Sequence, residues 1–266
     1  MCMYEWVIFM KVMTFNLRTD FILDFNNRWS KRSNIVYNLI SKYHCDIVGV
    51  QELNMKMYGD IVENIKDYNI VGNPRTKKFF IERNDILVNK EHKIISSNTF
   101  WLSKRPEKVG SSKWYSLYPR ICTTAAVQLR SGEKVRVYNT HLDCFLPQAR
   151  EYGLKIIEEY IDYYYNIDNL PIILMGDFNA KPNSKLIKKS QLLNRRNLMA
   201  IQEFDKTMYT RTTMSMFKGK YKGRHIDYIF VSDEFMIEKA EIVEFNKLGK
   251  YPSDHYPIMG EIKLKN

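Results

Sequence analysis

Three short polar clusters in the last third of the chain each adjoin an apolar run with the composition of a β-strand. They are Gly176-Asp177-Phe178-Asn179, Arg224-His225-Ile226-Asp227 and Ser253-Asp254-His255. Carboxylates, an amide and an imidazole at strand ends are the groups that activate water and neutralise phosphate charge in metal-assisted hydrolysis. The residue types and their positions therefore indicate chemistry on a phosphoester.

Two polar residues at earlier strand ends are candidates for holding a divalent metal ion. Glu52 follows the apolar run 46–50 in a polar turn, and Asn16 closes the first apolar run of the chain. Mg²⁺ prefers one or two carboxylates together with water and substrate phosphate oxygens. Taken alone, a glutamate in such a turn is usually solvated and an asparagine is usually a turn former. The metal interpretation therefore depends on the other polar clusters.

The remaining polar residues suggest a general base and its partners. Asp177 and Asn179 are alternate residues, which point to the same side of an extended backbone. A carboxylate there can remove a proton from water while the amide holds the acid or a phosphate oxygen. His141 ends an alternating run, and Asp227 could accept a hydrogen bond from an imidazole and keep it charged. Each residue also has an ordinary structural explanation, and a lone histidine is more often structural than catalytic.

Strands and helices that alternate along the chain would position these residues. The spacing of apolar residues predicts helices at 33–43, 54–66 and 148–165. Strands are expected at 11–17, 46–50, 85–88, 93–102, 121–129, 134–140, 171–175, 226–231, 239–245 and 258–264. This order is neither a strict β-α-β alternation nor an all-β series, which favours mixed sheets covered by helices.

The length of 266 residues is enough to bury a substantial core in a single domain, and neither a linker nor a repeat divides the chain. Residues 1–9 carry Glu5 and lack a basic leader or a cleavage site. We expect them to form an extension outside the core, with Met10 as an alternative start. No run reaches the roughly 18 apolar residues of a membrane span. The four cysteines form no CxxC pair, which favours free thiols in a reducing cytoplasm; they are Cys2, Cys45, Cys122 and Cys144.

The formal net charge of +11 points to an anionic partner, either nucleic acid or a phosphorylated small molecule. The lysines are dispersed, so a compositional bias is an equal explanation. Substrate selectivity is expected from three loops, at 19–30, 104–118 and 211–222. The last of these combines methionines and a phenylalanine with lysines, and it could touch a lipid surface or a base, or simply be solvated.

The ordered combination of these motifs resembles the endonuclease/exonuclease/phosphatase superfamily with the DNase I-like fold. The resemblance extends from 13–18 to 251–257 and includes a glutamate after the second strand. It also includes His-x-Asp at 141–143, Asp-x-Asn at 177–179, Ile-Asp-Tyr at 226–228 and Ser-Asp-His at 253–255. The sequences 99–103 and Pro119-Arg120 are similar to an uncharacterised bacterial branch. The resemblance implies an α/β four-layer sandwich of two mixed β-sheets flanked by helices.

The resemblance also implies a role for each polar residue. Glu52 corresponds to the principal ligand of Mg²⁺, or of Mn²⁺ as the alternative ion, with Asn16 beside it and Asp254 on the metal or leaving-group side. Asp177 corresponds to the general base. The other implied residues contact or stabilise phosphate: Asn179, His141, and His255 paired to Asp227. Arg120 and Asp143 match only the bacterial branch, where we expect them to bind substrate.

The expected function is a Mg²⁺-dependent, monomeric, cytoplasmic phosphoesterase that cleaves a phosphodiester by in-line attack of water activated by Asp177. A phosphomonoesterase acting on a small phosphorylated molecule is one alternative. A non-catalytic nucleic-acid-binding or protein-binding module is another, with aromatic rings that could stack on bases; the candidate rings are Trp101, Trp114, Tyr115 and Tyr118. The sequence does not identify the substrate, because one fold hosts many activities.

Overall fold

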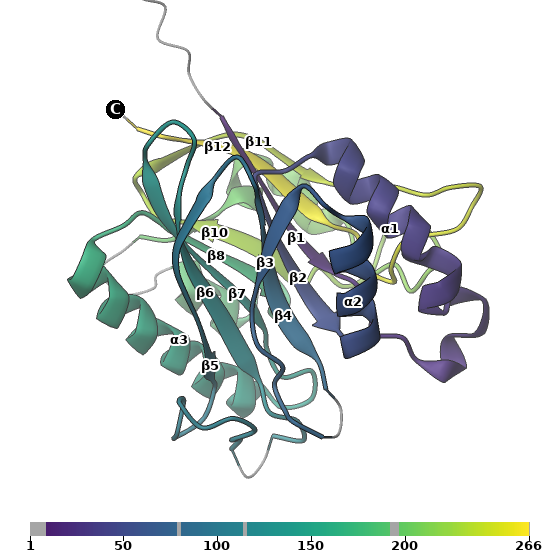
Figure 1. Ribbon diagram of the computed structural model, residues 1–266, viewed down its shortest axis with the longest axis horizontal. Coiled ribbons are helices and arrows are strands. Elements are labelled where there is room, and N and C mark those ends of the chain that lie inside the picture. Colours follow the sequence, from purple (N-terminus) through teal and green to yellow (C-terminus); the bar gives the residue numbers. More distant parts are fainter. Residues whose placement is uncertain (1–8, 79–80, 114–115, 192–196, 266) are drawn as a thin grey trace, which may run out of the picture.

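Two six-stranded β-sheets pack face to face, with helices on their outer surfaces (Figure 1). The computed structural model describes residues 9–78, 81–113, 116–191 and 197–265. Most of the expected N-terminal extension, Cys2 and the aromatic pair Trp114 and Tyr115 therefore lie outside the described residues. The four-layer α/β sandwich predicted from the sequence is confirmed.

The first sheet has the strand order β11-β12-β1-β2-β4-β3. Its strands are β1 (Met10–Asn16), β2 (Ile47–Leu53), β3 (Tyr68–Val71), β4 (Arg83–Asn89), β11 (Phe235–Ile242) and β12 (Ile258–Leu264). Helices α1 (Trp29–Tyr43) and α2 (Met55–Asn64) cover its outer face, preceded by the short 3-10 helix η1 (Ile22–Asn27). Only β1 and β2 pair in parallel.

The second sheet has the order β5-β6-β7-β8-β10-β9. Its strands are β5 (Lys93–Trp101), β6 (Ile121–Gln128), β7 (Lys134–His141), β8 (Ile172–Asp177), β9 (Met199–Ala200) and β10 (Asp227–Val231). Helix α3 (Pro147–Asp168) packs on its outer face near the shorter α4 (Lys185–Gln191), and the 3-10 helices η2 (Ile201–Phe204) and η3 (Lys206–Thr210) precede β10. Here β7 and β8 form the parallel pair.

Burial on both faces explains why strands such as β8 and β10 are nearly continuous apolar runs rather than alternating ones. Val12 and Ile47 of the first sheet share one core cluster with Val137, Met175 and Ile229 of the second. The outer faces pack against the apolar sides of the helices. No helix among the described residues combines the length and the apolar character that crossing a bilayer requires.

The differences from the predicted elements occur at short or exposed segments. The structure adds β3, β9 and α4, and it places β11 four residues earlier than the expected strand at 239–245. β11 is an edge strand with a bulge between Ile237 and Lys239, and half-buried and exposed residues alternate irregularly along it. An edge strand of this kind has no apolar period to reveal its register.

A buried polar bridge connects the two sheets beneath the site described below. Asn139 on β7 donates hydrogen bonds to the carbonyl oxygens of Val50 (2.9 Å) and Asp85 (2.8 Å), and it accepts one from Gln51 (2.7 Å). Gln51 also donates to the hydroxyl of Thr14. The three hydrogen bonds of Asn139 all cross from the second sheet to the first. Asn139 therefore fixes the position of one sheet relative to the other.

We predict that Asn139→Leu lowers the free energy of unfolding by about 3 kcal/mol. The substitution keeps the side-chain volume but removes the side-chain donor of two buried carbonyls, and each such loss costs roughly 1–2 kcal/mol. Gln51 keeps its hydrogen bonds to Thr14 and Gly49. Urea denaturation followed by fluorescence measures the change. The control is Asn98→Leu on exposed β5, where we expect a change within about 0.5 kcal/mol. Equal effects at the two positions would contradict the role given to Asn139.

Candidate active site

The two parallel strand pairs bring the predicted polar residues to one edge of the sandwich. Asn16 at the end of β1 is in register with Gln51 on β2, and His141 at the end of β7 is in register with Asp177 on β8. Asp227, at the start of β10, lies opposite Asp177. Because parallel strands end at the same edge, residues far apart in the sequence become neighbours there.

A break in β2 presents Glu52 to this edge. The register between β2 and β4 shifts between Val50 and Leu53, and Glu52 has a positive φ of 64°. A left-handed backbone at a residue with a side chain costs roughly 1 kcal/mol, and such strain concentrates at functional sites. Glu52 Oε1 accepts a hydrogen bond from Asn16 Nδ2 (2.9 Å) and Oε2 accepts one from the backbone N–H of Thr19 (3.0 Å).

Gly176 allows Asp177 to reach the same place. Its φ is 145°, and a Cβ atom there would lie 1.9 Å from the carbonyl oxygen of Thr140 on the neighbouring strand. Only glycine fits, and the buried carboxylate of Asp177 follows it directly. Asp177 Oδ1 accepts from the backbone N–H of Asn179 (2.8 Å), and Oδ2 accepts from Asn16 Nδ2 (3.1 Å).

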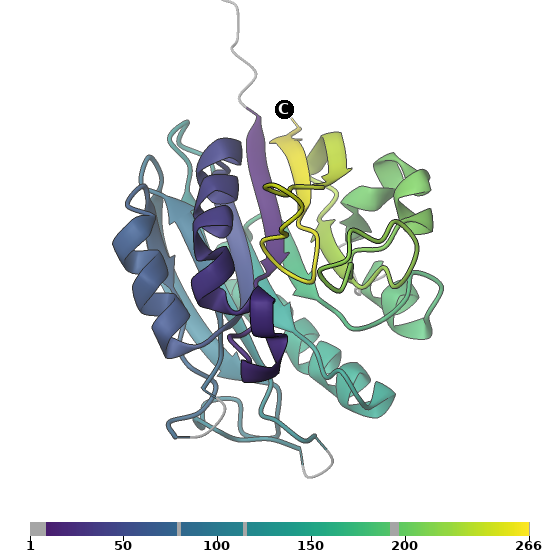
Figure 2. The same ribbon diagram turned by 90° about the vertical axis from the view of Figure 1, so that its right-hand side faces the viewer.

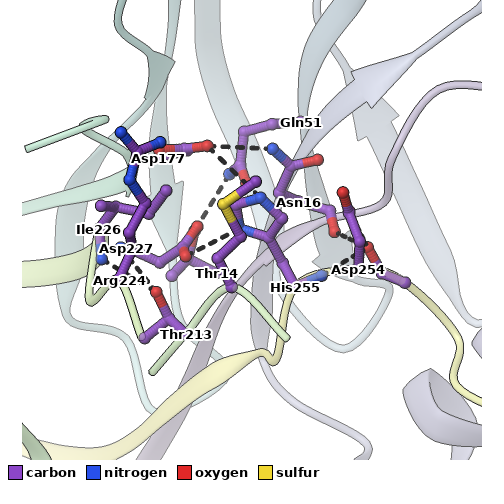
Figure 3. Close-up of polar contacts among 12 residues, drawn as sticks. Thr14, Asn16, Gln51, Asp177, Thr213, Arg224, Ile226, Asp227, Asp254 and His255 are labelled. Carbon is purple, nitrogen blue, oxygen red and sulfur yellow. Dashed lines mark hydrogen bonds and ion pairs between the residues drawn. The ribbon is translucent and has the colours of Figure 1, made fainter. Parts of the chain in front are cut away.

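Asn16 therefore joins Glu52 to Asp177, and Figure 3 shows its amide next to Asp177. The amide nitrogen faces both carboxylates, while Oδ1 accepts the backbone N–H of Arg18. In this arrangement Asn16 is a hydrogen-bond donor to the acidic residues. A ligand role requires the amide oxygen to turn toward them, so that part of the sequence interpretation stays a prediction.

His255 and Asp227 form a buried pair beside Asp177 (Figure 3). Nδ1 of His255 lies 2.9 Å from Asp227 Oδ2, and its Nε2 lies 3.9 Å from Asp177 Oδ2. Burial alone would lower the pKa of His255, but the carboxylate of Asp227 raises it well above the ordinary value. The imidazole is therefore protonated at neutral pH, with Nε2–H directed toward the general-base candidate.

The segment that carries His255 is held to the end of β1. The hydroxyl of Ser253 donates to the carbonyl of Asn16 (2.6 Å) and accepts the backbone N–H of His255 (3.2 Å). Arg32 of α1 donates to the carbonyls of Leu17 and Pro252 from one nitrogen. These contacts fix the position of His255 relative to Asn16 at the end of β1.

His141 lies on the opposite side of Asp177 and is neutral. Burial and the nearby guanidinium of Arg120 lower its pKa well below the ordinary value. Its Nε2 is 3.1 Å from Asn179 Nδ2, an N–H donor, so Nε2 is the acceptor and the proton sits on Nδ1. Nδ1 is buried without a hydrogen-bond partner among the described residues and lies 3.9 Å from Glu52 Oε1.

Burial and neighbouring groups shift the pKa values of the carboxylates in this site in different directions. Burial and the charge of Asp227 raise the pKa of Asp177 to about 7. Burial also opposes ionisation of Glu52, but His141 and hydrogen bonds from Asn16 and Thr19 lower its pKa below the ordinary value. Because His141 is itself neutral, we assign that lowering to the two hydrogen bonds. Burial raises the pKa of Asp254, which lies near Glu52 and Arg18.

Arg120 is a buried cation, 8% exposed, whose Nε has no hydrogen-bond partner in the described part of the chain. Its Nε lies 4.0 Å from Asp143 Oδ2, and its Nη2 lies 3.4 Å from the sulfur of Cys144. A buried guanidinium with an unused N–H group beside His141 could donate a hydrogen bond to a bound anion such as a substrate phosphate.

Asp143 has a structural task. Oδ1 accepts the backbone N–H groups of Phe145 and Leu146 at the start of α3, and Oδ2 accepts the hydroxyl of Ser116. These contacts use both oxygens, and the expected contact of Asp143 with substrate stays a prediction.

Two arginines that the sequence did not single out line the same edge. Arg18 holds Asp24 by two hydrogen bonds and lies 4.0 Å from Asp254. Arg75 is buried, pairs with Glu82 at 2.7 Å, and has its guanidinium carbon 5.0 Å from the centre of the Tyr118 ring. Arg18 could have been found from its position two residues after Asn16, whereas Arg75 follows the unpredicted β3 and had no such signal.

The donor set fits a hard divalent cation. Four buried or half-buried carboxylates converge at one edge, and Asp227 Oδ1 is buried without a partner among the described residues; the carboxylates are those of Glu52, Asp177, Asp227 and Asp254. Asp177, Asp227 and His255 also offer ligand atoms within 4.8 Å of one another. However, His255 and Asp227 already bind each other, and Mg²⁺ prefers oxygen. The acidic residues around Glu52 are therefore the better candidate binding site for Mg²⁺.

The three cysteines within the described residues form no disulfide. Cys45 and Cys122 are buried free thiols, and Cys144 is an exposed one. Trp101, one of the rings considered for base stacking, is buried and donates its indole N–H to the carbonyl of Arg75. Trp101 therefore packs in the protein interior beneath the site and does not present its ring to a base.

Comparison with solved structures shows the same fold in several proteins. An endonuclease/exonuclease/phosphatase from Bacteroides vulgatus is 25% identical, with a TM-score of 0.86 over 97% of this chain and 100% of that chain. A mannosyl-6-phosphatase from Bacteroides thetaiotaomicron is 24% identical, with a TM-score of 0.84 over 95% and 99%. TDP2 from D. rerio, complexed with a single-stranded DNA product, is 18% identical, with a TM-score of 0.76 over 96% and 99%. No curated protein sequence matches.

The sequence profile of the endonuclease/exonuclease/phosphatase family matches residues 13–255. The matched region begins before Asn16 and ends at His255, so it contains every residue that converges at the edge described above. The chain belongs to the endonuclease/exonuclease/phosphatase family, whose members are phosphoester hydrolases.

Proposed function

We propose that the protein is a Mg²⁺-dependent phosphodiesterase in which Asp177 activates the attacking water. The observation that carries the proposal is the convergence on Asp177 of an amide and two imidazoles. Asn16 Nδ2, His141 Nε2 and His255 Nε2 lie 3.1, 3.7 and 3.9 Å from Asp177 Oδ2. Asn16 Nδ2 and His255 Nε2 are donors there, whereas His141 Nε2 accepts from Asn179. A carboxylate in this setting can orient a water and take its proton while neighbouring donors contact phosphate.

Proton transfer falls to Asp177. Its carboxylate is buried between Asn16 and the backbone of Asn179, which fixes its orientation toward the centre of the site. With a pKa raised to about 7 by burial and Asp227, it is a stronger base than an ordinary aspartate and is roughly half ionised at neutral pH. A base whose pKa lies near the working pH is best suited to remove a proton from water.

Charge stabilisation falls to the two histidines and Asn179. The protonated His255, held by Asp227, donates from Nε2 to a phosphoryl oxygen. Asn179 Nδ2 donates to a second one when substrate replaces one of its two present acceptors, His141 Nε2 and the carbonyl of Leu142. His141 is neutral and donates from Nδ1, on the side of Glu52. The two imidazoles are in place before substrate binds, and pre-positioned donors stabilise the charge that develops on the phosphoryl group.

Glu52, with Asp254 and Asn16 beside it, would hold the metal ion. When bound, Mg²⁺ would supply positive charge for the phosphate and for the leaving oxygen. The Arg18 guanidinium, hydrogen-bonded to Asp24, lies 4.0 Å from Asp254 on this side.

We predict that Glu52→Gln weakens Mg²⁺ binding by at least about a hundredfold, because even the outer partners of metal ligands are worth 10–100-fold. Isothermal titration calorimetry on the full-length protein measures the affinity without substrate. Glu133→Gln, at the opposite end of the second sheet and exposed, is the matched control and should leave the affinity unchanged. An unaltered affinity in Glu52→Gln would place the metal elsewhere.

A phosphomonoesterase on a small phosphorylated molecule is the second candidate. It is favoured by the buried guanidinium of Arg120, since a terminal phosphate carries an additional negative charge that a diester lacks. A protein of the same fold is named a mannosyl-6-phosphatase, whereas TDP2 is complexed with single-stranded DNA. The non-catalytic binding module is less favoured, because a site without catalysis has no use for a strained Glu52 and a charged His255–Asp227 pair.

Two chromogenic substrates separate these candidates. Hydrolysis of bis(p-nitrophenyl) phosphate and of p-nitrophenyl phosphate is compared with Mg²⁺, with Mn²⁺ and with EDTA. A diesterase prefers the first substrate, a monoesterase the second, and a binding module cleaves neither. Metal-independent cleavage of either would refute the proposal. A panel of DNA, RNA, nucleotides, inositol phosphates and phospholipids then identifies the natural class.

A further inference from the structure

Three loops around the site carry exposed apolar side chains, and two of them also carry unbalanced positive charge. They are the η1 segment (20–27), the basic loop (211–224) and the hairpin loop (245–251), which follow β1, precede β10 and precede β12. In Figure 2 all three lie on the face turned toward the viewer, in dark purple, yellow-green and yellow. They belong to a surface that the proposed chemistry does not use.

The η1 segment holds a dense group of exposed apolar residues. Phe21, Ile22, Leu23 and Phe25 fall within five positions and are between 44% and 74% exposed. Phe25 has a positive φ of 43°, a backbone conformation that disfavours a bulky side chain. Exposed apolar groups of this kind mark interaction sites when they are contiguous and rimmed by polar residues.

Internal ion pairs cancel the acidic residues of this segment. Arg28 forms two hydrogen bonds with Asp20, and Arg18 forms two with Asp24. The carboxylates point back into the protein while the apolar side chains face outward. The segment is thus a rigid apolar projection without free negative charge.

The other two loops add apolar tips and cations. The basic loop exposes Met216 and Tyr221, and the hairpin loop exposes Leu248, which is 96% accessible. Neither 211–224 nor 245–251 contains an aspartate or glutamate. The exposed cations of these loops are Lys218, Lys220, Lys222, Arg224, Lys247 and Lys250.

The three loops contact one another and the site. A Cβ atom added at Gly219 of the basic loop would lie 2.1 Å from the hydroxyl oxygen of Tyr251, so the hairpin loop packs against the basic loop. The backbone N–H of Met216 donates to the carbonyl of Asp254, and the guanidinium carbon of Arg32 lies 5.7 Å from the centre of the Phe217 ring. Arg32 also donates to the carbonyl of Asn27 in η1. The backbone N–H of Thr19, at the base of η1, holds Glu52. The loops therefore form the rim of the active site.

We propose that this rim docks on the surface of an anionic phospholipid bilayer. Apolar side chains with lysines among them are the composition of interfacial membrane-binding segments: the apolar groups enter the acyl boundary and the cations attract anionic headgroups. A nucleic acid would use the lysines but has no use for aliphatic tips such as Ile22 and Leu248. The inference does not depend on the proposed function, because docking is measured without turnover.

Vesicle co-sedimentation of the full-length protein tests the docking. We expect binding to vesicles in which phosphatidylglycerol replaces about a third of the phosphatidylcholine, and much weaker binding to phosphatidylcholine alone. The double variant Ile22→Ser/Phe25→Ser should lower the partition coefficient by about a hundredfold, since each side chain contributes its burial in the acyl boundary. Hydrolysis of a small water-soluble phosphoester by this variant should be unchanged.

The matched control is Tyr163→Ser/Ile167→Ser, which removes an equally exposed aromatic and aliphatic pair from α3. Figure 1 shows α3 on the other side of the molecule from η1. This variant should bind vesicles as the unmodified protein does.

The charge component is tested in the same way. Replacing the three lysines 218, 220 and 222 by glutamine should lower binding to anionic vesicles by about a hundredfold, because each basic residue near such a surface contributes about a factor of five. The equal change in charge at Lys90, Lys93 and Lys134, at the opposite end of the sheets, is the control. Absence of vesicle binding, or vesicle binding unaffected by the η1 variant, would overturn the inference. Binding to single-stranded DNA without binding to vesicles would overturn it in favour of nucleic acid.

Discussion

Asp177→Asn is expected to reduce turnover of the cleavable phosphoester by about a thousandfold, the usual contribution of a positioned general base. The substitution keeps the shape of the side chain and its position after Gly176. It removes the basic oxygen that takes the proton from water. Substrate binding should change little, because the donors that contact phosphate remain. Steady-state kinetics with Mg²⁺ present should therefore show a fall in kcat at nearly constant KM.

The same variant should fold normally. Asp177 is a buried carboxylate near a second one, Asp227, so its removal relieves a repulsion that raises its pKa. Against this, an asparagine cannot accept the hydrogen bonds of both Asn16 and Asn179 as the aspartate does. We expect the two effects to leave the free energy of unfolding within about 1 kcal/mol. Asp168→Asn, which loses an ion pair with Arg136 far from the site, is the control and should retain turnover. Near-normal kcat in Asp177→Asn would remove the base from the mechanism.

The position of the site was predictable because its residues sit at strand ends. Asn16, Glu52, His141 and Asp177 all follow apolar runs, and the sequence alone marks where such runs stop. Parallel pairing then brings the ends of β1 with β2, and of β7 with β8, to one edge. The pairing of the strands therefore determines where a residue at the end of a buried strand lies, independently of the side chains around it.

The contacts within the site were not predictable in the same way. That Asn16 uses its nitrogen to join Glu52 and Asp177 depends on Arg18, whose backbone N–H takes the amide oxygen. That His141 carries its proton on Nδ1 depends on the amide of Asn179. Such orientations follow from hydrogen bonds between segments 36 to 161 residues apart or from local turns, and spacing along the chain does not encode them.

Short and exposed segments were the other source of error. β3 has four residues and β9 has two, too few to show a period. Arg75 lies in the loop after β3, and its burial against Glu82 and Tyr118 arises only once the two sheets are assembled. For Asp143 the motif was visible in the sequence, but its contacts were not. One oxygen accepts hydrogen bonds from the turn before α3, and the other accepts one from Ser116.

His255→Ala is expected to lower kcat by about a thousandfold, because it removes the charged donor that faces Asp177 and the phosphoryl group. The buried carboxylate of Asp227 is then left without its partner. A fall of about 2 kcal/mol in the free energy of unfolding is therefore expected as well. To separate the two effects, kcat is measured at a temperature where the variant is fully folded by circular dichroism.

Asp227→Asn shows whether Asp227 acts through His255 or by itself. Its contact with His255 at 2.9 Å is what keeps the imidazole charged and oriented, so the single variant should lose about a hundredfold in kcat. If Asp227 serves only to hold His255, the double variant with His255→Ala should be no slower than His255→Ala alone, since residues that act as a unit are not additive. A multiplicative loss in the double variant would mean that Asp227 contacts the reacting groups directly, as the unpartnered Oδ1 allows.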